Sequence, residues 1–405
     1  MELPQIKKGK SSNFYNELTG IRAIAAYMVF LHHYNFFFSK ERFGSFIHSF
    51  VGEFHVGVTI FFVLSGFLIC YRYYDNFNLK SSKWMVEYIQ NRIARIYPVY
   101  FLITTMTFLI IIIHSSHLSF PGLNFKVVPY GGQGISLHRD IILYILNITF
   151  IRGFFDDFHF TGVGQGWSLT VEECFYICAP FIFYFSKKLK LVIPLIFIFF
   201  TGLLICYLFK DINFYGFFGN LKFELYFTFF GRCFEFFVGI KLALIFKNKY
   251  ENKTLKSNHK TFIGIIYMAI CISIMALIKG DKTYSSETLV GILINNFILP
   301  MGIAILFLGL LTENTYVKRV LKTKIFVLCG KSSYSFYLIH VAIINVAVAK
   351  ITHNTLIIFL IINVASIIIF KFFEEPCNKY IRKINIYTSL GRIKSLFTGR
   401  VSLQE

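Results

Sequence analysis

Charged residues are scarce in this sequence, and acidic residues are the scarcest of them. Lysine, arginine, aspartate and glutamate make up 15% of the 405 residues, and only 21 residues are acidic. A soluble protein of this size could not cover its surface with so few charges. Hydrophobic residues supply 56% of the chain, and several apolar runs approach the ~20 residues that a spanning helix needs. The composition therefore excludes a soluble globular protein and predicts an all-α, polytopic helical bundle in a membrane.

Other absent features narrow the function further. The polar start of the chain lacks the cleavage pattern of a signal peptide, so we expect the first apolar helix to stay in the membrane. None of the eight cysteines falls in a segment expected outside the cell, which argues against a disulfide framework. Cys174 and Cys178 share a helix face without a third ligand nearby in sequence, so we expect no metal site. The net charge of +20 is spread over short loops without an aromatic-interleaved basic domain, so we expect no nucleic-acid partner.

The distribution of basic clusters predicts the topology. Lysine and arginine collect on the cytoplasmic side of membrane proteins. Every basic cluster reaches that side if the short apolar run at residues 139–152 enters the membrane and returns without crossing it. The sequence then predicts one re-entrant element and about ten transmembrane helices, at residues 20–38, 56–72, 96–113, 166–186, 191–209, 223–246, 261–279, 288–311, 326–349 and 355–373.

This topology divides the chain into three parts. Residues 1–16 form a cytoplasmic N-terminal segment, residues 17–376 a membrane domain, and residues 377–405 a basic cytoplasmic tail. We expect both termini in the cytoplasm and the protein in the inner (cytoplasmic) membrane. Residues 115–165, with the run Gly-Gly-Gln-Gly at 131–134, are expected to cover a site on the outer face. Irregular backbone at membrane depth is tolerated only where protein covers it or where it lines a cavity.

Arg22 and His33 lie in the first strongly apolar stretch. Ionisable groups inside a membrane helix are costly, so each one is a candidate functional residue. Eleven residues on a helix separate these two by roughly 16 Å along the axis. Such a pair can hold an anionic cofactor near one membrane face and carry out proton chemistry deeper in the bilayer.

Two further sites stand out at the ends of spans. Arg92 and Arg95 share a helix face where an inner loop enters the membrane. They either clamp phosphates or only follow the positive-inside rule. Glu172 is expected one to two turns below the outer surface, beside Trp167, which is either an interfacial anchor or part of the site. A carboxylate at that depth indicates a role in acceptor binding or catalysis.

Two other sets of ionisable residues lie within predicted spans. Arg232 and Glu235 are three residues apart and share a helix face. They either form a buried ion pair that holds helices together or line a polar cavity with His33. His340 either bonds to a neighbouring helix or belongs to that same site.

Several motifs together resemble a known family. In order, they are Leu18-Thr-Gly-Ile-Arg22-Ala-Ile-Ala-Ala with His33, Phe61-Phe-Val-Leu-Ser65-Gly-Phe67, Arg92-Ile-Ala-Arg95-Ile-Tyr-Pro98, Trp167-Ser168-Leu-Thr-Val-Glu172, Arg232-Cys-Phe-Glu235-Phe, Ser333-Tyr334-Ser-Phe-Tyr-Leu-Ile-His340 and Phe373-Glu-Glu375-Pro376. Each motif alone is weak, but seven in this order, over residues 17 to 376, are similar to acyltransferase family 3. Many members carry a C-terminal extracytoplasmic esterase-like domain, for which this chain has no room, so the resemblance implies a stand-alone membrane enzyme.

The resemblance implies an O-acyltransferase. Members move an acyl group, most often acetyl, from cytoplasmic acyl-CoA to a hydroxyl of an envelope polysaccharide, lipopolysaccharide or lipid-linked sugar. We assign the catalytic chemistry to His33 and Glu172. The CoA phosphates would contact three arginines, Arg22, Arg92 and Arg95. Acceptor-binding or cavity-lining roles go to Ser65, Trp167, Ser168, Arg232, Glu235, Tyr334 and His340.

No tightly bound cofactor is expected, since acetyl-CoA or another acyl-CoA is a donor substrate. The other expected partners are the glycan acceptor and membrane lipids, and the sequence leaves open whether the chain forms a homo-oligomer. Two other functions compete with this one. A transporter or flippase of lipid-linked sugars would favour inverted repeats and paired broken helices, which the sequence does not display. A non-catalytic membrane scaffold would tolerate the loss of His33.

Overall fold

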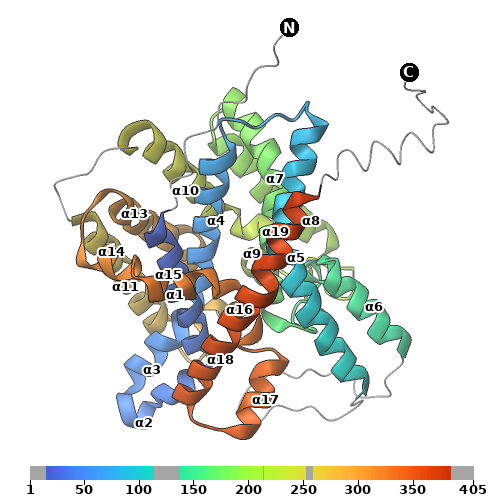
Figure 1. Cartoon of the computed structure of the whole chain (residues 1–405), viewed down its shortest axis with the longest axis vertical. Coiled ribbons are helices and arrows are strands. Elements are labelled where there is room, and N and C mark those ends of the chain that lie inside the picture. Colours follow the sequence, from blue (N-terminus) through green and yellow to red (C-terminus); the bar gives the residue numbers. More distant parts are fainter. Residues whose placement is uncertain (1–14, 114–136, 213, 252–258, 385–405) are drawn as a thin grey trace.

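The computed structural model describes residues 15–113, 137–212, 214–251 and 259–384. These residues form the all-α bundle that the composition predicts (Figure 1). Their one strand-like pairing is an isolated bridge between Phe155 and Phe217. Residues 1–14 of the N-terminal segment, the run at 131–134 and residues 385–405 of the tail lie outside the described residues.

The α-helices have the following bounds. The first half of the chain holds α1 (Asn16–His33), α2 (Lys40–Phe43), α3 (Ser45–Gly52), α4 (Gly57–Tyr73), α5 (Ser82–Ile113), α6 (Leu137–Ile148), α7 (Trp167–Lys188) and α8 (Val192–Phe209). The second half holds α9 (Leu221–Phe227), α10 (Phe229–Ile245), α11 (His259–Ile278), α12 (Leu289–Leu293), α13 (Leu299–Thr312), α14 (Tyr316–Leu321), α15 (Lys324–Lys331), α16 (Ser333–Ile339), α17 (Ile343–Ile351), α18 (Thr355–Ile369) and α19 (Glu375–Lys383).

Seven helical stretches of the described chain are long and apolar enough to cross a membrane. They are Ser45–Tyr73, Ser82–Ile110, Gly164–Lys188, Val192–Phe209, His259–Ile278, Leu289–Thr312 and Thr355–Lys383. The bundle is therefore polytopic, as predicted, but this count is lower than the ten spans expected from apolar runs. The three expected spans outside this set are those at residues 20–38, 223–246 and 326–349.

Polar residues and helix breaks account for the difference. Helix α1 is continuous, but Glu17, Arg22 and its histidines lower its mean hydropathy. The expected span at 223–246 is divided at Thr228, whose extended backbone ends α9 and whose hydroxyl accepts a hydrogen bond from the amide of Gly231 at the start of α10. The expected span at 326–349 is divided into α15, α16 and α17. Interrupted helices at membrane depth are tolerated where protein surrounds them or a cavity adjoins them.

Glycines bring the central helices close together. Helix α4 packs most extensively against α10. A Cβ on Gly66 would meet the backbone of Phe236, and one on Gly239 would meet the backbone of Val63. Small residues at helix interfaces permit this approach of two backbones. The phenylalanine–glycine motif of α4 is thus a packing surface, with the rings of Phe62 and Phe236 stacked 4.8 Å apart.

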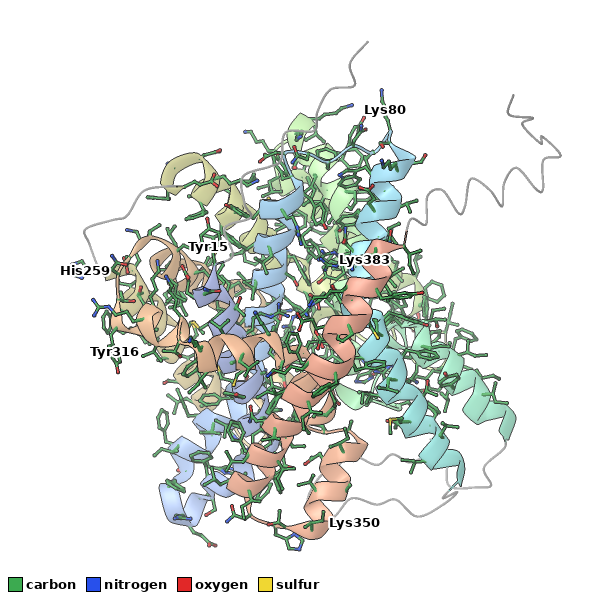
Figure 2. All side chains as sticks on the ribbon, in the orientation of Figure 1. Tyr15, Lys80, His259, Tyr316, Lys350 and Lys383 are labelled. Atoms are coloured by element: carbon green, nitrogen blue, oxygen red, sulfur yellow. The ribbon has the colours of Figure 1, made fainter. Side chains whose placement is uncertain are left out.

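The segment that precedes α7 covers one side of the bundle. Helix α6 has 12 residues, too few to span a bilayer, and the re-entrant element at residues 139–152 stays a prediction. A fully buried Arg152 follows α6 and donates hydrogen bonds to the carbonyls of Thr161 and Val163, the latter at 2.7 Å. These bonds hold irregular backbone in place inside the protein. Lys80 and Lys350 lie at opposite ends of the long axis (Figure 2).

Candidate active site

A cavity of about 900 Å³ runs between the helices. Its walls come from α1, α4, α5, α7, α15, α16 and α19. Along α4 it reaches from Arg72 to Val58, which is about 21 Å of helix. The cavity therefore extends through much of the thickness of a membrane.

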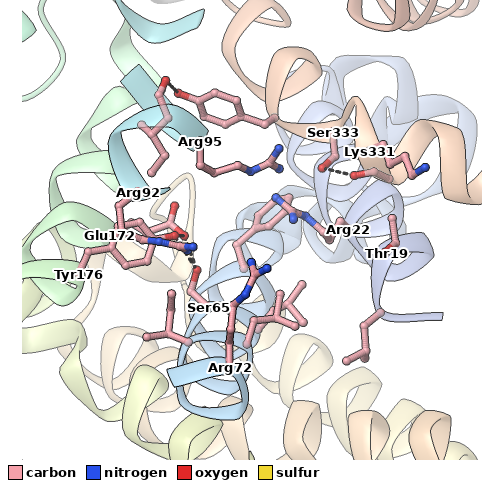
Figure 3. Close-up of a pocket in the computed structure, with 18 of the residues that line it drawn as sticks. Thr19, Arg22, Ser65, Arg72, Arg92, Arg95, Glu172, Tyr176, Lys331 and Ser333 are labelled. Carbon is pink, nitrogen blue, oxygen red and sulfur yellow. Dashed lines mark hydrogen bonds between the residues drawn. The ribbon is translucent and has the colours of Figure 1, made fainter. Parts of the chain in front are cut away.

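Basic side chains dominate one end of the cavity. Eight lysines and arginines line it against five acidic residues; the basic set is Arg22, Arg72, Arg92, Arg95, Lys247, Lys331, Lys379 and Arg382. The guanidinium groups of Arg22, Arg72 and Arg95 point into one space from α1, α4 and α5 (Figure 3). Three of these cations pair with acidic residues of the same lining, namely Arg95, Lys247 and Lys379. The remaining excess of positive charge favours an anionic ligand.

The arginines differ in the partners they already have. Arg95 forms a 2.6 Å ion pair with Glu374, which also accepts a 2.7 Å bond from Ser335. Arg92 lies over the rings of Tyr73 and Tyr176, at 5.4 and 5.3 Å. Arg22 makes no ion pair with a described residue, and its Nε has no hydrogen-bond partner among them. Arg22 therefore has no carboxylate of its own in the described chain to give up when it binds an anion.

Glu172 lies on the wall of the same cavity. Its carboxylate accepts hydrogen bonds from the hydroxyls of Ser65 and Tyr176, the latter at 2.5 Å. Ser65 belongs to the phenylalanine–glycine motif of α4, residues 61–67, and Tyr176 lies one helical turn after Glu172 on α7. The two hydroxyls hold the carboxylate in position beside the arginines.

Two hydroxyl groups lie toward the end of the cavity near Phe61, whose ring is 6.0 Å from that of Tyr337. The hydroxyls of Ser168 and Tyr337 lie 2.7 Å apart. Each hydroxyl is also within hydrogen-bond distance of the backbone carbonyl of Gln165, at 3.0 and 3.1 Å, and each has one proton to donate. The ring of Tyr337 lies 5.6 Å from the ring of His340. This end of the cavity thus adjoins a histidine.

His33 lies just beyond that end. Eleven residues are about 20° more than three full helical turns, so His33 shares a face of α1 with Arg22. Its ring is 5.3 Å from that of His340. The neighbouring His32 instead bonds the carbonyl of Gly52 through Nδ1, at 2.5 Å. Arg22 and His33 are therefore on one face of one helix.

Arg232 and Glu235 form a buried ion pair at 2.8 Å, with 1% and 0% of their side chains exposed. Arg232 also donates to the Thr59 hydroxyl at 3.1 Å and lies over the ring of Phe62. The sequence allowed either a buried ion pair or a cavity-lining role, and the structure contains the ion pair, which joins α10 to α4. Neither residue lines the cavity in the described part of the chain.

The structure brings together seven of the twelve residues selected from the sequence. The residues that line the cavity are Arg22, Ser65, Arg92, Arg95, Ser168, Glu172 and Tyr334. Five others do not line it in the described chain: His33, Trp167, Arg232, Glu235 and His340. Sequence reasoning missed Tyr176 and Tyr337, although Tyr337 lies within the motif that ends at His340.

Comparison with known families agrees with this geometry. The model of an acyltransferase domain matches residues 15–372, which is most of the sequence. The chain belongs to the acyltransferase 3 family. No solved structure matches the chain.

Named relatives are distant. A Staphylococcus aureus (strain COL) protein with a provisional O-acetyltransferase name is 25% identical over 397 residues, which cover 92% of this chain and 58% of the relative. The peptidoglycan O-acetyltransferase OatA of Listeria monocytogenes is 25% identical over 391 residues, with 91% and 56% covered. A Bacillus subtilis (strain 168) protein with a provisional peptidoglycan O-acetyltransferase name is 25% identical, with 81% and 48% covered. The chain spans about half the length of these relatives.

Proposed function

We propose that this protein transfers an acetyl group from cytoplasmic acetyl-CoA to a hydroxyl group of a cell-envelope glycan or lipid-linked sugar. One observation carries the proposal. A single cavity is basic at one end and, further along α4, has paired hydroxyls beside a histidine. An acyl-CoA is polyanionic at one end and carries its reactive thioester at the other.

The donor enters from the basic end. Arg22, Arg92 and Arg95 contact its phosphates, because guanidinium groups match phosphate oxygens in charge and geometry. The arm that carries the thioester then follows α4 inward. Glu172 and Ser65 lie on the wall along this path.

The acceptor reaches the thioester from the opposite side of the membrane. His33 acts as the general base, since imidazole is the side chain whose ordinary pKa suits proton transfer near neutral pH. The segment after α6 covers this approach. Because two relatives are named for peptidoglycan, a peptidoglycan fragment is the first acceptor to test.

The deciding experiment uses the purified full chain in lipid nanodiscs with acetyl-CoA labelled in its acetyl group. We expect label to appear on the hydroxyls of envelope glycan fragments, as measured by mass spectrometry. Loss of O-acetyl groups from the glycans of cells that lack the gene would support the same conclusion. Unchanged envelope glycans in those cells, together with no transfer in vitro, would refute the proposal. Transport of a lipid-linked sugar without any acyl-CoA would then favour the flippase alternative.

The proposed orientation has its own test. The basic end of the cavity faces the cytoplasm, as do both termini, in the inner membrane. Lys80→Cys and Lys350→Cys place labels at the two ends of the molecule (Figure 2). In intact cells, an impermeant maleimide is expected to label Cys at position 350 and not at position 80. The opposite pattern would reverse the topology.

A further inference from the structure

The Tyr337 hydroxyl lies at the end of the cavity opposite the basic residues. Tyr337 and Ser168 are nearly buried, with 6% and 5% exposed, and both line the cavity. The neighbouring lining residues Val58, Phe61 and Leu169 are apolar. Tyr337 and Ser168 thus add two hydroxyl groups to a part of the described lining that these apolar side chains otherwise form.

Tyr337 can release its present hydrogen bond without leaving a buried acceptor unpaired. The carbonyl of Gln165 lies within hydrogen-bond distance of both the Tyr337 and the Ser168 hydroxyl, so either one can donate to it. If the Tyr337 hydroxyl turns toward a ligand, Ser168 still satisfies that carbonyl, so the usual cost of an orphaned buried acceptor is avoided. The Ser168 hydroxyl also lies 2.7 Å from that of Tyr337 and limits where the phenol can point.

A buried basic nitrogen lies on the ring of His340, which is next to the ring of Tyr337, with 5.6 Å between the two centroids. Nδ1 of His340 donates to the carbonyl of Tyr337 at 2.7 Å, because a carbonyl can only accept. In the neutral ring, Nε2 then carries the lone pair. It is buried and has no hydrogen-bond partner in the part of the chain that the structure describes. The His340 ring lies 5.6 Å from Tyr337 and 5.3 Å from His33.

The backbone around these groups is tied to the covering segment. The side-chain amide of Gln165 donates to the carbonyls of Tyr337 and Leu338, at 3.1 and 2.6 Å. This joins the loop before α7 to the end of α16. The donor, the base and the loop are therefore held in one rigid group.

We propose that the Tyr337 hydroxyl binds the carbonyl oxygen of the acyl thioester and stabilises the negative charge that develops there during transfer. This inference rests on the proposed acyltransferase function and names the catalytic group within it. Ser168 positions the phenol. A donor aimed at the developing oxyanion in a water-poor site stabilises the transition state more than the ground state.

The acceptor oxygen forms a bond to the carbonyl carbon, and its proton passes to the imidazole pair of His33 and His340. The carbonyl π electrons move to the oxygen that Tyr337 holds. When the carbonyl re-forms, the C–S bond breaks and the sulfur takes the proton from the imidazole, which yields the ester and free CoA thiol.

The test compares Tyr337→Phe with wild type in nanodiscs. We expect kcat for acetyl transfer to fall by ~10²–10³, the usual loss when one oxyanion donor is removed, with the Kd of acetyl-CoA within threefold of wild type. Tyr88→Phe is the matched control, because the buried Tyr88 also donates to a backbone carbonyl, that of Tyr176, but does not line the cavity. Its kcat is expected to stay within threefold.

Infrared spectroscopy supplies a readout that a purely structural role would not change. With acetyl-CoA labelled by ¹³C at the carbonyl, the bound C=O band should lie at lower frequency in wild type than in Tyr337→Phe. If Tyr337→Phe does not fold, Ser168→Ala takes its place, with an expected loss in kcat and a smaller shift of the same band.

Each other outcome counts against the inference. Unchanged kcat in folded Tyr337→Phe overturns the assignment while leaving the acyltransferase function intact. A covalent acetyl group on Ser168, detected by mass spectrometry without acceptor, would make Ser168 the nucleophile and also overturn it. Absence of transfer by wild type would refute the proposed function itself.

Discussion

Replacing Arg22 by Met tests the donor site most directly. Methionine keeps much of the apolar stem of the side chain and removes only the guanidinium group. Arg22 lines the cavity and has no carboxylate partner among the described residues. A hydrogen bond to a charged group contributes about 1.5–3 kcal/mol, so the Kd of acetyl-CoA should rise roughly 10- to 150-fold.

The same change has a predictable effect on thermal stability. At a donor concentration of 100 times the wild-type Kd, binding stabilises the wild-type fold by about 2.7 kcal/mol. A variant that binds roughly 40-fold more weakly gains only about 0.7 kcal/mol at that concentration. Without donor, Arg22→Met should be at least as stable as wild type, because an unpaired buried cation is costly.

The assay measures the melting temperature in detergent with and without acetyl-CoA, and the Kd by titration. Arg319→Met is the control, because Arg319 is exposed on α14 and does not line the cavity. A Kd within threefold of wild type for folded Arg22→Met would refute the phosphate-binding role. A large loss of stability without donor would instead assign Arg22 to the packing of the bundle.

His33→Gln should lower glycan acetylation by ~10²–10⁴ with acetyl-CoA affinity retained, and normal acetylation would remove His33 from the mechanism. Gly66→Ala should destabilise the bundle by about 1–3 kcal/mol, because a Cβ there meets the backbone of Phe236; an unchanged melting temperature would contradict that packing. His159 lies outside the spans, and burial lowers its pKa from the ordinary value to about 4. Because the unfolded chain then binds a proton more readily than the folded protein, the folded protein loses stability as the pH falls from about 6.5 toward 4. Between pH 7 and 5, the free energy of unfolding of wild type should fall by ~2 kcal/mol more than that of His159→Gln. Equal pH dependence in the two proteins would show that His159 does not cause the loss of stability.

The sequence alone decided the class of protein and much of the site. With few charges and long apolar runs, the chain is stable only as a helical bundle in a membrane, because so large an apolar surface is stable in contact with lipid and not with water. Ionisable residues are so few within the runs that the buried ones could be identified individually. Arg22, Arg92, Arg95 and Glu172 were found in this way, and the structure places all four on one cavity.

The pattern of apolar residues did not predict where the helices break. The run at residues 223–246 stays apolar where α9 gives way to α10, whereas α15 ends and α16 begins within the Gly-Lys-Ser-Ser sequence at residues 330–333. Apolar periodicity reports burial, and it does not report where tertiary contacts replace the hydrogen bonds of a continuous helix. The count of spans therefore came out higher from the sequence than from the structure.

Only the tertiary structure decided which groups meet. Tyr337 bonds the carbonyl of Gln165, a residue 172 positions earlier, and Arg95 pairs with Glu374 across 279 positions. Arg232 and Glu235 are neighbours on a helix, yet their pairing away from the cavity depends on how α10 lies against α4. A sequence states which side chains must be satisfied when buried, whereas the packing of distant helices selects the partner that satisfies each one.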